Sequence, residues 1–419
     1  MSEAISIENP KVPASEVFAK EGYKKTKLGW IPEEWSVKSL GEIGVFSKGK
    51  GISKSEITET GLPCVRYAEI YTKYNNYVYC FNSFINRNSA QNSKTIESGD
   101  ILFAGSGETL EDIGKCIAYL GKETVYAGGD IIVLKPKTEN SKYLSFALNH
   151  SIANKQKHKL GQGHSVVHIY SSSLKNLKII LPPLPEQQKI AAILSTWDNA
   201  ISKQEQLIAA KQHYKKGLMQ LLLTGKKRFD GFDEGWEEVR LRDLAKITMG
   251  QSPDSVSYND KKVGLWLIQG NADIKQRKSR PRFWTSQSTK ICEIGEILMT
   301  VRAPVGAVAK SEHKACIGRG VCSIKPNESN DFIYYKLLNF EKKWSKYEQG
   351  STFSAVSSSD IKNLKINIPN SIKEQQEISQ VLTDADIEIA LIQNQLTQLQ
   401  TQKRGLMQKL LTGALRVKI

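Results

Sequence analysis

The chain has 419 residues, a formal net charge of +16 and a pI near 9.3. This length allows two or three domains with separate cores, and the excess of Lys and Arg favours a polyanionic partner. With no apolar run of about 18 residues and no signal-peptide or lipidation pattern, we expect a cytoplasmic protein rather than a membrane protein. The six cysteines include no CxxC pair, so we expect mostly buried, reduced thiols.

The second half of the chain repeats the first. The clearest match pairs GLMQLLLTG at 217–225 with GLMQKLLTG at 405–413, which lie 188 residues apart and agree at eight of nine positions. Four further blocks match in the same order, at separations between 187 and 201 residues. A duplicated unit of this kind predicts five segments, namely an N-terminal arm at 1–24, a domain at 25–183, a helix at 184–225, a second domain at 226–370 and a second helix at 371–419.

The first domain is predicted to be a mixed α/β domain with curved, mostly antiparallel strands. Short alternating runs such as DIIVLKPK at 130–137 and turns rich in Gly, Ser and Asn indicate this class. Basic residues alternate with aromatic ones, and small residues in the turns at 105–115 and 161–165 would let backbone amides approach a phosphate, although such turns can also be plain hairpins. We predict DNA contacts from this domain at Lys48, Lys50, Lys54, Arg66, Tyr67, Lys73, Arg87, Ser106, Lys115, Gln162 and His164.

The helix predicted at 184–225 follows the proline-rich segment LPPLPEQQ and ends at Thr224–Gly225, which suits the start and stop of a helix. Apolar residues at spacings of three and four form one seam, and a second apolar stripe runs from Ile193 to Leu221. At 1.5 Å per residue, about 37 residues make a rod of roughly 55 Å.

The second domain is predicted to have the same mixed α/β class, with strands such as GVCSIKP at 320–326. Its basic stretch KQRKSRPRFW at 275–284 is the most concentrated cluster of positive charge. Such a cluster suits DNA, because Arg reads guanine bidentately and both Arg and Lys bind phosphates. A solvated loop without a ligand is the alternative. We predict DNA contacts at Lys275, Arg277, Lys278, Arg280, Arg282, Arg302, Arg319 and Ser351.

The second helix places apolar residues from Ile378 to Leu410 at alternating spacings of four and three, interrupted only by Lys403. This pattern predicts that the two helices pack as a coiled coil. Apolar residues on more than one side would leave a surface for a partner, unless the coiled coil is purely intramolecular. The residues predicted to bind that partner are Ile193, Trp197, Leu207, Tyr214, Leu382, Ile389 and Leu396.

An enzyme is the main alternative from another class. The segment FAGSG at 103–107 is similar to the glycine-rich turn that holds S-adenosylmethionine in adenine methyltransferases, but their catalytic [DNS]PP[FYW] tetrapeptide is absent and the repeated counterpart MTVRA has no glycine. His164 and His168 lack a third nearby metal ligand. We therefore expect no catalytic residue and no metal site. A coiled-coil scaffold with two unrelated binding domains would explain the repeat but not the basic patches.

The segments YKKTKLGWIPEEW at 23–35 and LPPLPEQQKIAAIL at 181–194, with a long helix ending in LLTG given twice, resemble the specificity subunits of type I restriction-modification systems. The resemblance covers about residues 23–413. Two departures are that the second copy reads IPNSIKEQQ where the first reads LPPLPEQQ, and that residues 1–22 have no counterpart in the repeat.

The resemblance implies an α+β fold with two target-recognition domains separated by two long antiparallel coiled-coil helices. Each domain would read one half of an asymmetric bipartite site in double-stranded DNA, and the helices would set the unread spacer. The implied partners are two methyltransferase (modification) subunits and the restriction subunits. S-adenosylmethionine, ATP and Mg²⁺ would act in those partners, with no cofactor in this chain.

Overall fold

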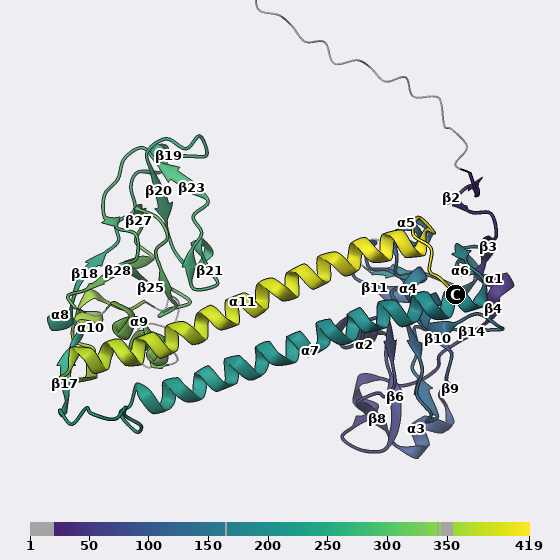
Figure 1. The fold of residues 1–419 in the computed structure, drawn as a ribbon, viewed down its shortest axis with the longest axis horizontal. Coiled ribbons are helices and arrows are strands. Elements are labelled where there is room, and N and C mark those ends of the chain that lie inside the picture. Colours follow the sequence, from purple (N-terminus) through teal and green to yellow (C-terminus); the bar gives the residue numbers. More distant parts are fainter. Residues whose placement is uncertain (1–20, 164–165, 329, 342, 345–354) are drawn as a thin grey trace, which may run out of the picture. The chain divides into compact units, whose positions relative to one another are not determined.

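The computed structural model describes residues 21–163, 166–328, 330–341, 343–344 and 355–419 (Figure 1). The chain divides into two compact units, of which the first holds residues 1–202 and 397–419 and the second holds residues 203–396. Both divisions fall inside long helices, so each unit contains part of each helix. The five segment boundaries predicted from the repeat divide the chain differently and stay predictions. His164, Ser351 and residues 1–20 of the predicted arm lie outside the described residues.

The first unit contains two five-stranded sheets and several short helices. One sheet has the order β4 (Gly44–Lys48), β14 (Ile131–Pro136), β10 (Ile101–Ala104), β12 (Cys116–Tyr119) and β7 (Tyr77–Val78). The other has the order β5 (Ile57–Thr58), β8 (Ser83–Ile85), β6 (Leu62–Val65), β13 (Val125–Ala127) and β9 (Lys94–Ile96). Three two-stranded pairs are β1 (Tyr23–Thr26) with β2 (Gly29–Pro32), β3 (Ser36–Ser39) with β16 (Lys178–Leu181), and β11 (Ser106–Gly107) with β15 (Val167–His168). The short helices are α1 (Leu40–Ile43), η1 (Lys54–Glu56), α2 (Tyr67–Thr72), α3 (Arg87–Gln91), α4 (Ser141–Leu148), α5 (Ser151–Leu160) and α6 (Ser171–Leu174).

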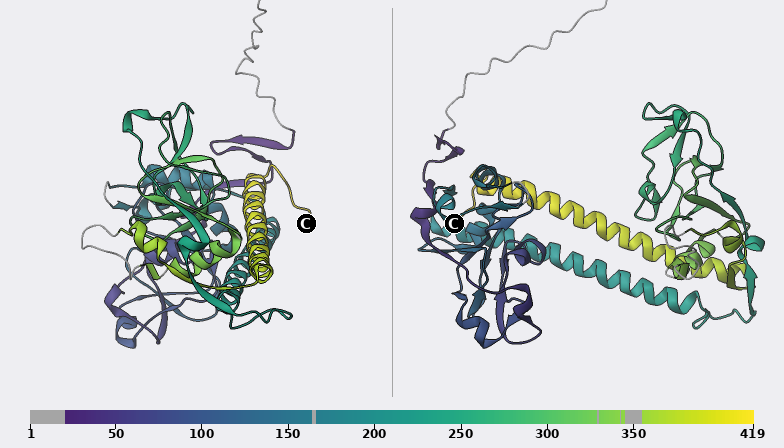
Figure 2. Two further views of the ribbon diagram at one scale, coloured as in Figure 1. Left: turned by 90° about the vertical axis from the view of Figure 1, so that its left-hand side faces the viewer. Right: turned by 180° about the vertical axis from the view of Figure 1, so that it is seen from behind.

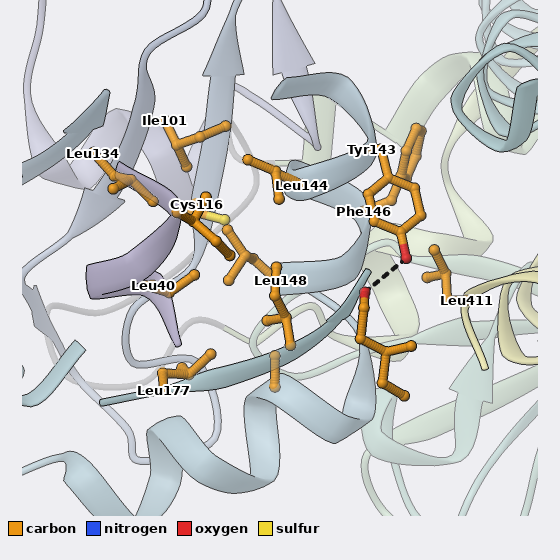
Figure 3. Packing of buried hydrophobic residues seen from close by; sticks show 14 of the residues in the cluster. Leu40, Ile101, Cys116, Leu134, Tyr143, Leu144, Phe146, Leu148, Leu177 and Leu411 are labelled. Carbon is orange, nitrogen blue, oxygen red and sulfur yellow. Dashed lines mark hydrogen bonds between the residues drawn. The ribbon is translucent and has the colours of Figure 1, made fainter. Parts of the chain in front are cut away.

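The core of the first unit lies where α4 packs against the sheet that contains β10 and β14 (Figure 3). Strand β10 is buried at every position because both of its faces are covered. The Tyr143 hydroxyl donates to the Ile180 carbonyl at 2.9 Å, which satisfies its polar atom inside the core. Leu410 and Leu411, from the end of the second long helix, are buried in the same cluster. The helix end is thereby fixed to this domain.

The second unit repeats this topology. Its larger sheet has the order β18 (Ala245–Met249), β28 (Val321–Pro326), β25 (Ile297–Thr300), β26 (Val308–Lys310), β22 (Lys278–Ser279) and β21 (Ile274–Lys275). Its other sheet has the order β19 (Tyr258–Asn259), β23 (Phe283–Thr285), β20 (Leu265–Ile268), β27 (Ala315–Ile317) and β24 (Ile291–Cys292). Strand β17 (Trp236–Arg240) pairs with β29 (Lys365–Pro369). The short helices are α8 (Leu241–Leu244), η2 (Ser255–Ser257), η3 (Asn271–Asp273), α9 (Asn330–Phe340) and α10 (Ser358–Lys362).

The sheets of the two units correspond closely, except that the second unit has β21 in addition. The series β4, β14, β10, β12 and the series β18, β28, β25, β26 each consist of antiparallel neighbours in the same chain order, and the pairs β6 with β13 and β20 with β27 are both parallel. Most of the strand pairs are antiparallel, as the turn-rich sequence predicts. The internal duplication therefore extends to the hydrogen-bonding pattern of the backbone.

Two long helices, α7 (Leu184–Leu222) and α11 (Ile372–Leu411), contribute to both units (Figures 1 and 2). They run antiparallel within each unit. In the second unit, Gln204 Nε2 donates to the Ile392 carbonyl at 3.3 Å, while Lys215 further along α7 pairs with Asp386 nearer the start of α11 at 2.6 Å. The predicted fold class, α+β with two mixed α/β domains and two long antiparallel helices, is confirmed by these elements and by the matches to known proteins given below.

The ends of the long helices are held by reciprocal ion pairs. Arg416, which follows the end of α11, pairs with Glu186 in the first turn of α7, and Arg228, which follows the end of α7, pairs bidentately with Glu374 in the first turn of α11 at 2.8 and 2.7 Å. Each acid is buried, so each arginine supplies the charge that the buried carboxylate needs. The two pairs occupy equivalent places in the repeat.

Two expectations from composition can be compared with the structure. Five of the six cysteines are buried free thiols, and Cys80 is exposed. Within the described ranges, no helix is both long enough and apolar enough to cross a lipid bilayer.

Candidate nucleic-acid interface

A cavity of about 640 Å³ opens among the loops of the second unit. It lies where the segments after β18, β20 and β25 meet the segment that leads into β28, and its polar lining includes Ser252, Tyr258, Gln269, Asn271, Arg302 and Arg319. Arg302 and Arg319 are exposed, and neither forms an ion pair within the described ranges. Two unpaired guanidinium groups beside amide and hydroxyl groups can bind phosphates or the edges of bases.

Backbone hydrogen bonds hold the loops around this cavity. The Gly250 N–H donates to Val321 O at 3.0 Å, and the Gly318 N–H donates to Ile268 O at 2.8 Å. A Cβ atom at Gly250 would lie 2.1 Å from Gly318 O, so only glycine allows this approach. The Gln269 N–H donates to the buried carboxylate of Asp273 at 2.8 Å, which fixes the backbone at the point where the Gln269 side chain begins.

The first unit has an equivalent set of hydrogen bonds from backbone N–H groups. We call this set, in each unit, the loop frame. Gly49 N–H donates to Ile131 O at 2.7 Å, Gly128 N–H donates to Val65 O at 2.9 Å, and Arg66 N–H donates to the buried Glu69 carboxylate at 2.9 Å. A Cβ atom at Gly49 would lie 2.0 Å from Gly128 O, the same restriction as at Gly250. The loop frame is therefore shared, while the side chains that it carries differ.

The frame of the first unit carries four predicted contact residues. Arg66 is half-buried, and its Nε atom is buried without a hydrogen-bond partner. The Ser106 hydroxyl lies 2.9 Å from His168 Nδ1, and Gln162 pairs with His168 through their backbones. Ser106 is buried, so its hydroxyl positions His168 rather than facing solvent. Lys50 is exposed and donates its backbone N–H to Ala127 O at 3.1 Å.

In the basic stretch at 275–284, the cations are mostly engaged with carboxylates of this chain. Arg277 pairs with Glu341, Lys278 and Arg280 both pair with Glu312, and Arg282 pairs with Asp273 at 3.1 Å. Hydrogen bonds from Lys278 and Arg280 hold the pKa of Glu312 below its usual value. Lys275 is exposed and forms no ion pair in the part of the chain that the structure describes. The cluster of charge seen in sequence is therefore largely neutralised in the fold.

The other predicted cations of the first unit fall into two groups. Lys48, Lys54 and Arg87 are exposed, which leaves them available to a ligand. Lys73 pairs with buried Glu69 at 2.7 Å, and the Lys115 ammonium donates to two backbone carbonyls at 3.2 and 2.8 Å. Burial lowers the pKa of Lys115. Lys73 and Lys115 thus stabilise the fold through contacts within this unit. Tyr67 is half-buried and packs against the apolar cluster that both five-stranded sheets form.

A second buried lysine supports the loop frame of the first unit. The Lys157 ammonium donates to Gly114 O at 2.8 Å from α5, which ties down the loop between β11 and β12. Burial lowers the pKa of Lys157 to about 8. Beside it, His158 Nε2 lies 2.8 Å from Glu111 O in the same loop.

The residues predicted on the helices for a partner also separate by burial. Leu207 and Tyr214 are 42% and 62% exposed and lie two turns apart on one side of α7, with Leu221 continuing the stripe. Leu382 and Ile389 are buried inside the second unit and are unavailable to another chain. Ile193, Trp197 and Leu396 are half-buried. Within the second unit, the apolar surface that remains on α7 is the stripe of Leu207, Tyr214 and Leu221.

Comparisons with known proteins bear on what these loops bind. The family model of the type I restriction modification DNA specificity domain matches the chain twice, over residues 32–211 and 233–401. The chain belongs to this family. As a member it is a non-catalytic, DNA sequence-recognising specificity subunit, and catalysis resides in partner subunits.

Relatives match over nearly their whole length. A Methanocaldococcus jannaschii protein named "Putative type I restriction enzyme MjaX specificity subunit" is 33% identical, with 96% of this chain and 98% of the relative covered. The type I restriction enzyme MjaVIII specificity subunit of the same organism is 24% identical, with 96% and 97% covered. Among solved structures, a chain from work on complex assembly and conformational transition of the type I R-M system is 26% identical, with a TM-score of 0.59 and coverage of 92% and 99%. The type I S subunit from M. genitalium has the same TM-score at 16% identity and 90% and 96% coverage, which shows a shared fold.

Sequence reasoning missed Ser252, Gln269 and Asn271, which line the cavity of this specificity subunit. These residues carry no charge, so a search for basic clusters passes over them. Aligning the ends of β6 and β20 across the repeat would have placed Gln269 opposite Arg66.

Proposed function

We propose that this specificity subunit reads a bipartite, asymmetric DNA site, with one half-site bound by the loop frame of each unit. The observation that carries the proposal is the shared loop frame with different side chains on it. Arg302 and Arg319 line the cavity of the second unit, whereas the equivalent positions of the first unit are Ser106 and Gly129. Two frames of the same backbone with different side chains suit two half-sites of different sequence.

We propose that contacts to phosphates come from the exposed, unpaired cations around each frame. In the first unit these include Lys48, Lys50 and Lys54, and in the second they include Lys275. Arginines that already neutralise carboxylates, such as Arg280, would have to break an ion pair to bind a phosphate. They therefore contribute less to binding than the same residues would as free cations.

The partner subunits are proposed from the family role and from the exposed stripe on α7. Two methyltransferase subunits and the restriction subunits would assemble with this chain, and Leu207 and Tyr214 offer apolar area to one methyltransferase subunit. S-adenosylmethionine, ATP and Mg²⁺ would be bound by those partners. This chain would supply only DNA recognition.

The first experiment expresses the chain with the modification subunit encoded beside it in an unmethylated host and maps methyladenine by long-read sequencing. A bipartite motif with an unread gap, lost when this chain is omitted, is the expected result. A soluble complex that adds no methylation would contradict the proposal.

A second experiment measures how DNA affinity falls with salt. Removing one phosphate contact lowers the slope of log K against log [salt] by about 0.9. We expect this for Arg302→Ala or Arg319→Ala in the assembled complex, and a much smaller change for Arg280→Ala. Equal slopes for all three variants would contradict the assignment of the cavity as the interface.

A further inference from the structure

One position recurs in both loop frames with a side chain suited to reading a base. In the parallel pairs β6 with β13 and β20 with β27, it is the residue directly after the first strand. Arg66 follows β6, and Gln269 follows β20. The preceding carbonyl is held in both units, since Val65 O accepts from Gly128 N–H at 2.9 Å and Ile268 O accepts from Gly318 N–H at 2.8 Å. The two positions are therefore equivalent in the backbone.

A buried acid holds the N–H of this residue in both units, although the local structure differs. In the first unit the acid is Glu69, three residues on and inside α2, and in the second it is Asp273, four residues on and at the end of η3. Both carboxylates are 3% exposed. Hydrogen bonds from Lys73, Ser83 and Arg66 N–H hold the pKa of Glu69 low despite its burial. The hydrogen bond from this N–H to a buried carboxylate is present in two different local structures. Both domains therefore preserve the backbone position of this residue.

The side chains at this position are not used by the fold. Gln269 is exposed and lines the cavity together with Arg302 and Arg319. Arg66 forms no ion pair in the described part of the chain, and its buried Nε atom has no hydrogen-bond partner. A buried donor without an acceptor is rare in folded proteins. Arg66 differs in this respect from Arg277 and Arg280, whose guanidinium groups are paired with carboxylates.

We propose that this position reads one base in each half-site, with Arg66 reading a guanine and Gln269 reading an adenine. The guanidinium fork of arginine matches the O6 and N7 acceptors of guanine, and the glutamine amide matches the N6 donor and N7 acceptor of adenine. Anchoring the backbone of each residue reduces the conformational freedom lost when its side chain binds. This inference rests on the proposed function, because it names the bases that the same loop frames would read.

The test is an exchange of the two side chains, read by the methylome of the complex described above. Arg66→Gln should replace a guanine by an adenine, or lose the guanine preference, at one position of one half-site. Gln269→Arg should make the reverse change at one position of the other half-site. Preference for the wild-type base should fall by roughly tenfold to a hundredfold. Matched controls are Arg242→Gln, on α8, and Gln287→Arg, after β23, which do not line the cavity and should leave the motif unchanged.

A variant that no longer methylates is tested by binding of the assembled complex to duplexes that carry each base pair at the affected position. Loss of discrimination at that position alone supports the proposal. A uniform loss of affinity for all duplexes, or an unaltered motif in both exchange variants, overturns it. Failure of the proposed function is distinguishable, because the wild-type complex itself would then give no motif that depends on this chain.

Discussion

Two equivalent ion pairs between α7 and α11 should respond differently to the same substitutions. Lys403 pairs with Asp198 in the first unit, and Lys215 pairs with Asp386 in the second. The two lysines lie 188 residues apart in the sequence, and so do the two aspartates. One carboxylate oxygen of Asp198 is buried without a hydrogen-bond partner. The corresponding oxygen of Asp386 accepts from the Tyr335 hydroxyl at 2.8 Å. The first pair is therefore incompletely satisfied and the second is complete.

The expected magnitudes follow from burial. Asp198→Ala leaves Lys403 with 11% of its side chain exposed and no counter-charge, which should cost about 3 kcal/mol, the low end for a broken buried pair. Asp386 is 43% exposed, so water screens its pair and Asp386→Ala should cost about 1 to 2 kcal/mol, including the bond from Tyr335.

Replacing both members of each pair should distinguish the two ion pairs further by their effect on stability. Asp198→Leu with Lys403→Met removes the unsatisfied oxygen and both buried charges, so it should be neutral or stabilising. Asp386→Leu with Lys215→Met takes the charged acceptor from the Tyr335 hydroxyl and should cost about 1 to 2 kcal/mol.

The assay is urea unfolding of the full chain followed by hydrogen exchange and mass spectrometry. Peptides from 184–202 and 397–411 report on the first unit, and peptides from 203–222 and 372–396 report on the second. Equal shifts of stability in the same direction for both double variants, or an Asp198→Ala variant whose first unit is as stable as in the wild type, would contradict the difference between the two pairs.

Three further predictions concern other parts of the two units. Gly250→Ala should destabilise the second unit by about 1 to 3 kcal/mol, because its Cβ would meet Gly318 O, while Gly217→Ala, in open space on α7, should stabilise by about 0.5 to 1 kcal/mol; thermal unfolding of the two variants compares them, and equal shifts would contradict the loop frame. Burial lowers the pKa of Lys157 to about 8, so the unfolded chain holds this proton more tightly. Lys157 should therefore contribute a rise in native stability on the order of 3 kcal/mol between about pH 8 and pH 10.5, and Lys157→Met should remove this contribution in urea titrations. Leu207→Ser with Tyr214→Ser should reduce co-purification of the methyltransferase subunit while changing unfolding free energy by less than about 0.5 kcal/mol, and unaltered co-purification would remove this stripe from the interface.

The long helices were predictable because their apolar spacing is a local property of the sequence. Ile378 and Leu382 are fully buried, as the seam predicts. The segment predicted at 184–225 contains α7, which ends at Leu222, and the segment predicted at 371–419 contains α11, which ends at Leu411. The interruption at Lys403 was visible in the sequence, but its explanation was not. The partner, Asp198, is 205 residues away, and no local pattern links the two.

The site was less predictable, since long-range partners decide whether a charge is available. The stretch at 275–284 reads as a strong DNA-binding cluster, but its arginines meet carboxylates that are 9 to 64 residues distant. Gln269 gave no signal because it is uncharged. The repeat was visible in the sequence. Aligning its two copies matches the ends of equivalent strands and so identifies equivalent positions such as Arg66 and Gln269.

With each loop frame bound to one half-site, as we propose, one fold can carry two different DNA specificities. The contacts that build the frame come from backbone atoms and from glycines, Gly49 and Gly250, where a Cβ atom would lie within about 2 Å of a carbonyl oxygen. Substitution at these positions would disturb the loops, and with them every base contact at once. Substitution at 66 or 269 changes only a side chain, because the N–H of that residue is already satisfied by a buried acid. Specificity can therefore change one base at a time without a new backbone, which is why the exchange of Arg66 and Gln269 should alter the motif and leave the fold intact.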